Sequence, residues 1–348
     1  MKLLIITQKV DRRDPVLGFF HQWLLKLSSS FDKLTVICLE HAEDELSDQI
    51  KILSLGKENG PSRLKYLLRF YEYLWQERGN YDAVFVHMNQ EYILLAGWWW
   101  WILGKKVYLW RNHHSGNWLT DVAIFFCQNV FCTSQYSYTA KYQKTILMPV
   151  GIDTAIFKPD DSLAKLPNSI LFIARMAPVK KPHILLEALK KISDWSVIFQ
   201  ADFYGNPLPP NENYYRQLKK EVTVDNLGDR VHFYLGVPNT EITPLYNRHE
   251  IFVNLSSSGM YDKTIFEAMS CGSLVLVSNK NLDGEIDPMF LFQEGDAIDL
   301  AQKLKRLLLL SPAEKRRLAA DLKSYSDKYH SLDLLVKKLT RILIFYHD

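Results

Sequence analysis

Short runs of β-branched and aromatic residues alternate with longer stretches of helical periodicity through the first half of the chain. The short runs predict strands at residues 3–7, 34–39, 83–87, 106–110, 130–133 and 145–148. The longer stretches predict helices at residues 18–30, 63–78, 92–103, 118–126 and 135–142. This order is typical of a parallel sheet with helices on both faces.

The alternation begins again after a proline-punctuated link at residues 149–167. Further strands are predicted at residues 169–175, 197–200, 231–234, 251–255 and 274–277, and helices at 182–192, 212–224, 240–247 and after 262. Helical patterns close the chain, from a capping box at residues 311–314 to an amphipathic segment at 332–346. We therefore expect two doubly wound α/β domains, residues 1–150 and 151–328, and a terminal helix within 329–348. A cleft between the domains is the expected ligand site, because open α/β sheets bind at the carboxyl ends of their strands.

Composition agrees with a globular protein of two domains. The 348 residues exceed the usual size of one core, and the chain is 47% hydrophobic and 23% charged. A net charge of +3 is too small to indicate nucleic-acid binding and only mildly favours anionic ligands or an anionic membrane surface. The cysteines lie in apolar runs without metal-ligand spacing, which predicts buried reduced thiols and a cytoplasmic protein: Cys38, Cys127, Cys132 and Cys271.

Two apolar segments bear on membrane contact. Residues 1–8 are too short in their apolar part for a signal peptide and predict a strand. Residues 92–104 contain four consecutive tryptophans, Trp98 to Trp101, but about 13 residues cannot span a bilayer as a helix. We favour these tryptophans as core and cleft lining. The alternative is a membrane interface beside Lys105 and Lys106, where tryptophan and lysine are both favoured.

A polar loop between two predicted strands carries the strongest binding signal. Small residues from Ser256 onward lead directly into a helix, whose free backbone N–H groups and dipole favour an anion. Glu267 lies about one turn inside that helix, within reach of a sugar hydroxyl, and Gly272 ends it. The stretch therefore predicts a site for a nucleotide-linked ligand.

Two cations follow the predicted strand at residues 169–175. Arg175 and Lys180 are separated by a turn that contains Pro178, which would bring both to the carboxyl edge of the sheet. There an arginine fork and a lysine point charge could grip a diphosphate. The alternative is a pair of solvated charges in a loop.

Together these motifs resemble the retaining glycosyltransferases of family 4. The chain has a strand, Arg175, four residues, Lys180 and a helix, then Gly236 after a strand, the serine-rich loop, and Glu-Ala-Met-Ser-Cys-Gly at residues 267–272. Residues 148–153 are similar to the family's interdomain PNGID motif, with Val150 in place of asparagine. The resemblance implies a GT-B fold of two Rossmann-like domains, a nucleotide-sugar donor, retention of anomeric configuration, and catalysis without a metal or other cofactor. It also implies that the terminal helix packs back on the first domain.

The resemblance assigns donor-site roles residue by residue. Arg175 and Lys180 would bind the donor diphosphate and offset charge on the leaving group. Glu267 would be the second glutamate of an E-x7-E motif and bind the ribose. The remaining donor-side candidates are Gly18, Gly236, Lys263 and Thr264.

The first glutamate of that motif is missing, because its position is occupied by Gly259. Asp262 is the nearest carboxylate that could replace it in contacting the donor sugar. The alternative is a plain helix N-cap, and the sequence leaves both open.

Candidate residues of the first domain follow the predicted strands at 83–87 and 106–110. By the resemblance, a histidine in the second of these loops lies near the transferred sugar, and we favour His113 over His114. A solvent-exposed histidine pair is the alternative. Residues expected on the acceptor side are His87, Asn89, Glu91 and His114.

The sequence thus predicts a glycosyltransferase that moves a sugar from a nucleoside-diphosphate sugar to a glycan or lipid-linked acceptor. Its expected partners are the nucleotide sugar and that acceptor, with peripheral contact of the protein to the inner face of a membrane. No nucleic acid is expected. A nucleotide-sugar epimerase of the same fold and a non-catalytic binding protein are the alternatives. Nucleoside diphosphate release that requires acceptor distinguishes transfer from both.

Overall fold

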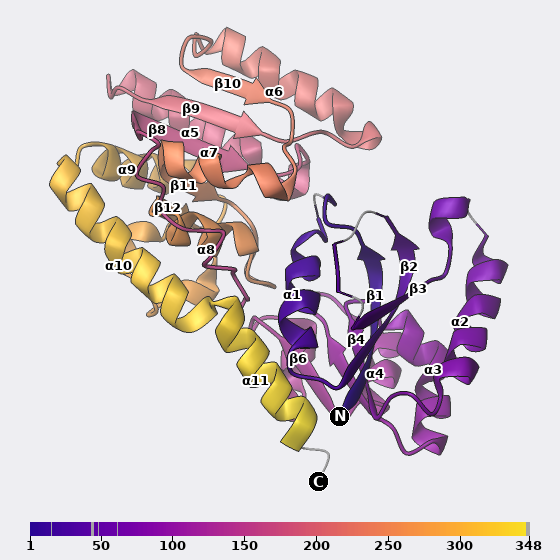
Figure 1. The fold of residues 1–348 in the computed structure, drawn as a ribbon. Coiled ribbons are helices and arrows are strands. Elements are labelled where there is room, and N and C mark those ends of the chain that lie inside the picture. The colour runs from indigo at the N-terminus through magenta and orange to yellow at the C-terminus, as the bar shows by residue number, and fades with distance from the viewer. Residues whose placement is uncertain (15, 43–44, 48, 61, 346–348) are drawn as a thin grey trace. The chain divides into compact units, whose positions relative to one another are not determined.

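The computed structural model describes residues 1–14, 16–42, 45–47, 49–60 and 62–345, and Figure 1 shows its helices and strands. The chain divides into two compact units. Unit 1 comprises Met1–Gly151 and the segment from Leu332 onward, and unit 2 comprises Ile152–Ser331. Each unit has its own parallel sheet, so the predicted class of two α/β domains is confirmed.

Unit 1 contains a seven-stranded parallel sheet in the order β3-β2-β1-β4-β5-β6-β7. Its strands are β1 (Lys2–Val10), β2 (Lys33–His41), β3 (Ile50–Ser54), β4 (Ala83–His87), β5 (Lys106–Trp110), β6 (Asn129–Cys132) and β7 (Thr145–Leu147). Its helices are α1 (Phe19–Ser28), α2 (Arg63–Glu77), α3 (Glu91–Ile102), α4 (Trp118–Phe125) and α11 (Leu332–Phe345), with 3-10 turns η1 (Lys57–Asn59) and η2 (Tyr138–Lys141). The strand order reverses between β1 and β4, so the ends of these two strands form the switch point where doubly wound sheets bind ligands.

The alternation of side chains along β1 separates two apolar cores, one on each face of the sheet. Leu3 and Ile5 belong to the core covered by α1 and α11, whereas Leu4 and Ile6 belong to the core covered by α2, α3 and α4. Nearly all of these positions are apolar because both faces are covered by helices.

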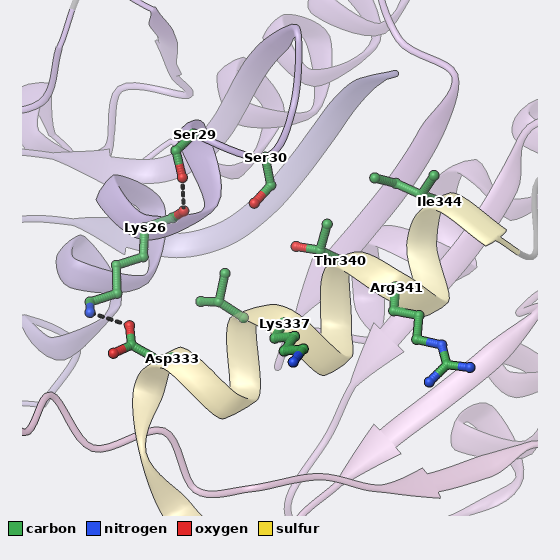
Figure 2. Close-up of a pocket in the computed structure, with 9 residues that line it drawn as sticks. Lys26, Ser29, Ser30, Asp333, Lys337, Thr340, Arg341 and Ile344 are labelled. Carbon is green, nitrogen blue, oxygen red and sulfur yellow. Dashed lines mark hydrogen bonds and ion pairs between the residues drawn. The ribbon is translucent and has the colours of Figure 1, made fainter.

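The terminal helix α11 is part of unit 1. Leu335 and Leu339 are fully buried in the same core as Trp23 of α1, and Lys338 donates to the Leu147 carbonyl at 2.7 Å. Figure 2 shows Lys26 of α1 paired with Asp333 of α11 beside a groove of about 590 Å³. The expectation for this helix extended to residue 348, and residues 346–348 lie outside the described residues.

Unit 2 contains a five-stranded parallel sheet in the order β10-β9-β8-β11-β12. Its strands are β8 (Leu166–Ile173), β9 (Gln200–Tyr204), β10 (Val231–Tyr234), β11 (His249–Asn254) and β12 (Leu274–Val277). Its helices are α5 (Pro182–Asp194), α6 (Glu212–Val224), α7 (Thr243–Arg248), α8 (Lys263–Ser270), α9 (Ala297–Leu308) and α10 (Pro312–His330). Here the order reverses between β8 and β11, which makes the loops after these strands the switch point of this unit.

Some predicted elements were wrong. The strand predicted at residues 197–200 begins only at Gln200, where β9 pairs with Ser169 of β8. The helix predicted at 135–142 is reduced to the turn η2, because Ser134 takes the backbone N–H of Tyr136 on its hydroxyl and that of Ser137 on its carbonyl. Two further elements, β3 and α9, were not predicted from the sequence.

Gly151, the last residue of the first segment of unit 1, tests the packing of α11. Its φ is +81°, and an added Cβ would lie 2.5 Å from Leu335 Cδ2. We expect Gly151→Ala to lower the free energy of unfolding of unit 1 by about 1–3 kcal/mol, since a left-handed backbone and a close contact both oppose a side chain. Hydrogen exchange of the β1 amides measures the change. Gly79→Ala is the control, because a Cβ there meets nothing within 4 Å; equal protection in the two variants would contradict this account.

Candidate functional site

At the switch point of unit 2, one lysine bridges the loops after two neighbouring strands. Lys180 follows β8, while Ser256 and Asp262 follow β11, and the two strands are neighbours that run parallel. Lys180 Nζ donates to Ser256 Oγ at 3.1 Å and to Asp262 Oδ2 at 3.1 Å. The structure therefore brings together Lys180 and Asp262, which lie 82 residues apart in sequence.

Asp262 is the N-cap of α8, and both of its carboxylate oxygens accept protein donors. Oδ1 accepts from the Thr264 amide at 3.3 Å and from the Thr264 hydroxyl at 2.8 Å, while Oδ2 accepts from Ser256 Oγ at 2.7 Å and from Lys180. Burial alone would raise the pKa of Asp262, but the Lys180 charge and these hydrogen bonds hold its pKa far below the ordinary value. Asp262 is thus a negatively charged cap, so it is already engaged before any contact with a donor sugar.

Arg175 lies two residues beyond the end of β8, in the loop rather than within the strand as the sequence predicted. Its side chain is exposed and makes no hydrogen bond or ion pair with any residue that the structure describes. Its backbone is nevertheless held, because the amides of Ala174 and Met176 donate to the carbonyls of Tyr204 and Asn206, each at 3.1 Å. The structure therefore presents a cation on an anchored loop at the switch point.

Glu267 of α8 is only 3% exposed, which differs from the predicted access to a ribose. Tyr246 Oη donates to Glu267 Oε2 at 3.1 Å, and Lys263 lies one turn earlier on the same helix. Burial raises the pKa of Glu267 and lowers the pKa of Lys263, and the opposite charge of each opposes the shift of the other. In this structure Glu267 lies in the core beneath α8, and Lys263 is half-buried on the same helix. The ribose contact stays a prediction.

Three further residues at this edge extend the candidate site. The Gly236 amide, after β10, donates to Asn206 Oδ1 at 3.1 Å, so the loops after β9 and β10 are tied together. Glu294 pairs with Lys181 and accepts from Ser257 Oγ at 3.0 Å. Neither Asn206 nor Glu294 was predicted from the sequence. A signal existed for Asn206, which directly follows a glycine at the end of a strand.

Unit 1 has a cavity of about 240 Å³ at the carboxyl ends of β4 and β5. It is lined by Met88, Asn89, Gln90, Glu91, Arg111, Asn112 and His113. The structure therefore gathers three predicted residues, Asn89, Glu91 and His113, in one pocket. His114 stacks on His113 with ring centroids 4.6 Å apart and does not line it.

His87, predicted on the acceptor side, is instead part of the core of unit 1. It is 1% exposed, its ring stacks on Phe20 at 4.0 Å, and its Nδ1 lies 3.3 Å from Thr7 Oγ1. The sequence placed it correctly at the end of β4 but could not show that α1 covers that face. In this structure His87 packs against α1 at the end of β4, and its acceptor-side role stays a prediction.

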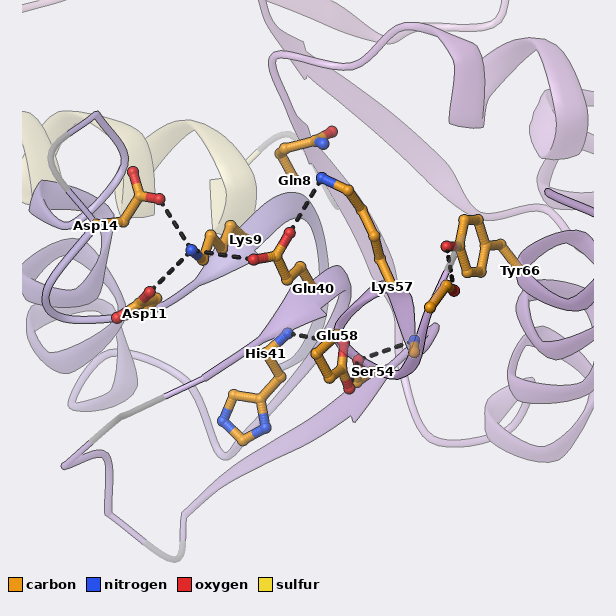
Figure 3. A network of polar contacts seen from close by, with 12 residues as sticks. Gln8, Lys9, Asp11, Asp14, Glu40, His41, Ser54, Lys57, Glu58 and Tyr66 are labelled. Atoms are coloured by element: carbon orange, nitrogen blue, oxygen red, sulfur yellow. Dashed lines mark hydrogen bonds and ion pairs between the residues drawn. The ribbon is translucent and has the colours of Figure 1, made fainter. Parts of the chain in front are cut away.

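The loop after β1 is held by a network of ion pairs, which Figure 3 shows. Lys9 Nζ contacts Asp11, Asp14 and Glu40 at 2.9, 3.1 and 3.1 Å. Partial burial would lower the pKa of Lys9, but these three carboxylates hold its pKa above the ordinary value.

This network gives Gly18 a structural explanation. Its amide donates to the Asp14 carbonyl at 3.0 Å, and an added Cβ would lie 2.6 Å from that oxygen. The glycine is therefore required by the turn itself, and its predicted approach to donor phosphates stays a prediction.

Three findings concern metals, thiols and membranes. Within the described ranges, no three His, Cys, Asp or Glu side chains are grouped so that they could hold a metal ion. All four cysteines are buried, and none forms a disulfide within the described part of the chain. No helix in the described part of the chain is both long and apolar enough to cross a bilayer.

Comparison with known proteins finds a family model that matches unit 2 and relatives that match part of the chain. Residues 154–326 match the family model described as glycosyl transferases group 1. The chain is 25% identical over 159 residues to D-inositol 3-phosphate glycosyltransferase of Segniliparus rotundus, covering 42% of this chain and 34% of that protein. It is 31% identical over 121 residues to spore coat protein SA of Bacillus subtilis, covering 34% of this chain and 32% of that protein. The chain spans about a third of the length of these relatives.

The whole chain is similar in fold to HepE of Anabaena, a structure solved in complex with UDP. The TM-score is 0.77 at 18% identity, and the match covers 99% of both chains. This likeness confirms the GT-B fold that the sequence motifs implied.

The Lys180–Asp262 pair predicts a pH dependence for unit 2. The folded pKa of Asp262 lies below the ordinary value of 3.8, so its ionised form stabilises the fold at neutral pH. That contribution is lost as the pH falls below 3.8 toward the lower folded pKa. We expect Asp262→Asn to cost about 1–3 kcal/mol of unfolding free energy at neutral pH and progressively less in acid.

Urea unfolding of the variant and the wild type across acidic and neutral pH measures this difference. Asp229→Asn is the matched control, because Asp229 is exposed and has no bond to a side chain of the described residues. A difference for Asp262→Asn that does not change with pH would rule out the ion pair as its cause.

Proposed function

We propose, from the premise that residues 154–326 form a domain of the glycosyl transferases group 1 family, that this protein transfers a sugar from a nucleoside-diphosphate sugar to a glycan or lipid-linked acceptor. The observation that carries the proposal is the pair of cations at the switch point of unit 2. Arg175 is exposed on an anchored loop, and Lys180 is fixed beside the start of α8. Two cations at one edge of the sheet suit the charge of a diphosphate.

The donor would be held by charge and by the start of a helix. Arg175 supplies a planar fork for phosphate oxygens, Lys180 supplies a point charge, and the dipole of α8 adds positive potential at the start of the helix. These groups would offset the negative charge that develops on the departing diphosphate, a role that requires no metal. Because Asp262 and Ser256 hold Lys180 in place, little reorganisation is needed when the donor arrives.

The chemistry that we propose is transfer with retention of anomeric configuration. The bond between the sugar and the diphosphate breaks as the acceptor hydroxyl attacks from the same face, and the hydroxyl proton leaves with the diphosphate. His113 of unit 1 would shape the surroundings of the transferred sugar. Ser115 contacts its Nδ1 through its amide nitrogen at 3.1 Å and its hydroxyl at 2.8 Å, which leaves the Nε2 edge of the ring for substrate.

Unit 1 also carries an apolar outer surface that suits a membrane. Each of the helices α2, α3 and α4 buries one side against the sheet and exposes apolar side chains on the other. Their exposed members are Leu64, Leu68, Tyr71 and Trp75 on α2, Leu95, Trp98, Trp101 and Ile102 on α3, and Trp118, Val122 and Phe125 on α4. We call these residues the aromatic face. Only Trp100 of the tryptophan run is fully buried, whereas Trp101 is 75% exposed, so the run that we favoured as core and cleft lining is not wholly core.

Cations flank the aromatic face on α2. Lys65 is exposed, and the Arg78 guanidinium lies 4.2 Å from the centre of the Trp75 ring. Aromatic residues beside lysine and arginine are typical of a surface that enters the headgroup region of an anionic bilayer. We therefore propose that the protein works in the cytoplasm at the inner face of the membrane, where a lipid-linked acceptor would be within reach.

The first prediction of this proposal concerns turnover. Arg175→Ala should lower the rate of acceptor-dependent nucleoside diphosphate release about 100- to 1000-fold, since it removes a group that stabilises the leaving group. Arg175→Lys should lower it less, because it keeps the charge and loses the fork. The assay supplies a panel of nucleotide sugars with glycan and lipid-linked acceptors. A chelator is expected to leave the wild-type rate unchanged.

Arg175→Ala is the cleaner variant because its side chain makes no contact that stabilises the described fold, whereas Lys180→Ala also breaks the pair with Asp262. Lys220→Ala on α6 is the control, since Lys220 is exposed and distant in sequence from the proposed donor loops. Full activity of Arg175→Ala would refute the donor site. Sugar interconversion without acceptor would identify an epimerase, and binding without turnover would identify a non-catalytic protein.

The second prediction concerns membrane binding. We expect the double substitution Trp98→Ser and Trp101→Ser to weaken co-sedimentation with phosphatidylglycerol vesicles roughly tenfold or more, since each buried aromatic side chain contributes about 1.5–3 kcal/mol. High salt should weaken wild-type binding further. Trp195→Ser is the control, because Trp195 is a partly exposed tryptophan of unit 2. Equal sedimentation of the double variant and the wild type would show that the aromatic face does not bind lipid.

A further inference from the structure

Arg111 is a cation in the pocket of unit 1 whose hydrogen-bonding capacity is incompletely used. It follows β5 directly, and its Nη2 donates to the Ser115 carbonyl at 2.9 Å. Its Nη1 is fully buried and has no hydrogen-bond partner among the described residues. A buried donor that lacks a partner costs free energy, so such a group points to a missing acceptor atom.

The charge of Arg111 is also uncompensated by an ion pair. Glu91 lines the same pocket, but no carboxylate of the described residues lies within 4.0 Å of the guanidinium nitrogens. Burial lowers the pKa of Arg111 from its ordinary value, while the negative charge of Glu91 opposes that change. An arginine nonetheless keeps its proton in proteins, so the pocket contains a permanent positive charge.

The other residues that line the pocket add neutral polar groups that could meet a ligand. Asn112 accepts from the Thr133 amide through Oδ1 at 2.7 Å, which leaves its NH₂ group for a ligand. The Nε2 edge of His113 is likewise available. Gln90 contributes a buried side-chain oxygen without a partner among the described residues, which suits a ligand hydroxyl.

The backbone under the pocket is held in a demanding conformation. Met88 has φ of +72°, which is unusual for a residue other than glycine, and its amide donates to the Trp110 carbonyl at 2.8 Å. The next residues lead into α3, and the dipole of a helix favours an anion near its N-terminus. Backbone conformations of this kind are concentrated at ligand-binding sites.

We propose that this pocket binds an acceptor that carries a phosphate or carboxylate group, and that Arg111 is the residue that selects it. The proposal rests on the function proposed above, because it names the class of substrate that the sugar is transferred to. The anionic group would accept from Arg111 Nη1 and compensate its charge, which a neutral hydroxyl cannot do. Hydroxyls beside the anionic group would meet Gln90 and Asn112. A volume of about 240 Å³ suits one sugar residue or a smaller group.

The test measures anion binding without turnover. The full-length chain with Arg175→Ala and Lys180→Ala provides the background, since it removes the cations of the proposed donor site. Inorganic phosphate is titrated into this protein calorimetrically at constant ionic strength, and acetate and glucose are titrated in parallel. We expect phosphate or acetate to bind, and Arg111→Gln to weaken that binding at least tenfold. The anion affinity of Arg111→Lys should lie between those of the background protein and Arg111→Gln.

Arg63→Gln is the matched control, because Arg63 is an exposed arginine of α2 outside the pocket. Equal weakening by Arg111→Gln and Arg63→Gln, no binding of either anion, or glucose binding that equals the anions would overturn the proposal. Stronger binding of phosphate or of acetate distinguishes phosphorylated from carboxylated acceptors. A failure here leaves the Arg175→Ala turnover test untouched, so the two proposals fail separately.

Discussion

The contact on which unit 2 depends is the bridge from Lys180 to Ser256 and Asp262. It joins the loops after β8 and β11, the two strands between which the sheet order reverses. A reversal of strand order leaves adjacent loops that turn to opposite faces, and doubly wound sheets bind ligands in the space between them. Lys180 joins the two loops here, while Asp262 also caps α8. One ion pair thus fixes the loops, the helix start and a cation for the proposed diphosphate.

Unit 1 follows the same topological rule with different side chains. Its strand order reverses between β1 and β4, and the loop after β1 is held through Lys9 by three carboxylates. The loop after β4 instead leads into the pocket with Arg111. Where carboxylates saturate Lys9, no capacity is left for a ligand. The guanidinium of Arg111 has a buried nitrogen without a hydrogen-bond partner among the described residues. For this reason we propose that Arg111 recognises the anionic group of the acceptor.

The aromatic face shows how one sequence feature can serve two purposes. A helix with apolar residues on all sides is usually buried on all sides. From the sequence, the tryptophan run was favoured as core and cleft lining. In the structure, Trp100 packs against the sheet while Trp98 and Trp101 turn outward. Periodicity identifies the helix, but it cannot show how many of its sides are covered by protein.

The sequence by itself determined the two α/β repeats, most strand positions, the start of α8 after residue 262 and the order of Arg175, Lys180 and the serine-rich loop. These follow from local periodicity, from helix-start chemistry and from motif spacing, all of which are written along the chain. Only the tertiary structure decided which candidates reach a surface. His87 and Glu267 carry suitable chemistry but are buried, because α1 covers one and the core around α8 encloses the other. No sequence motif pointed to Arg111, because a buried nitrogen without a partner among the described residues exists only after the chain has folded around it.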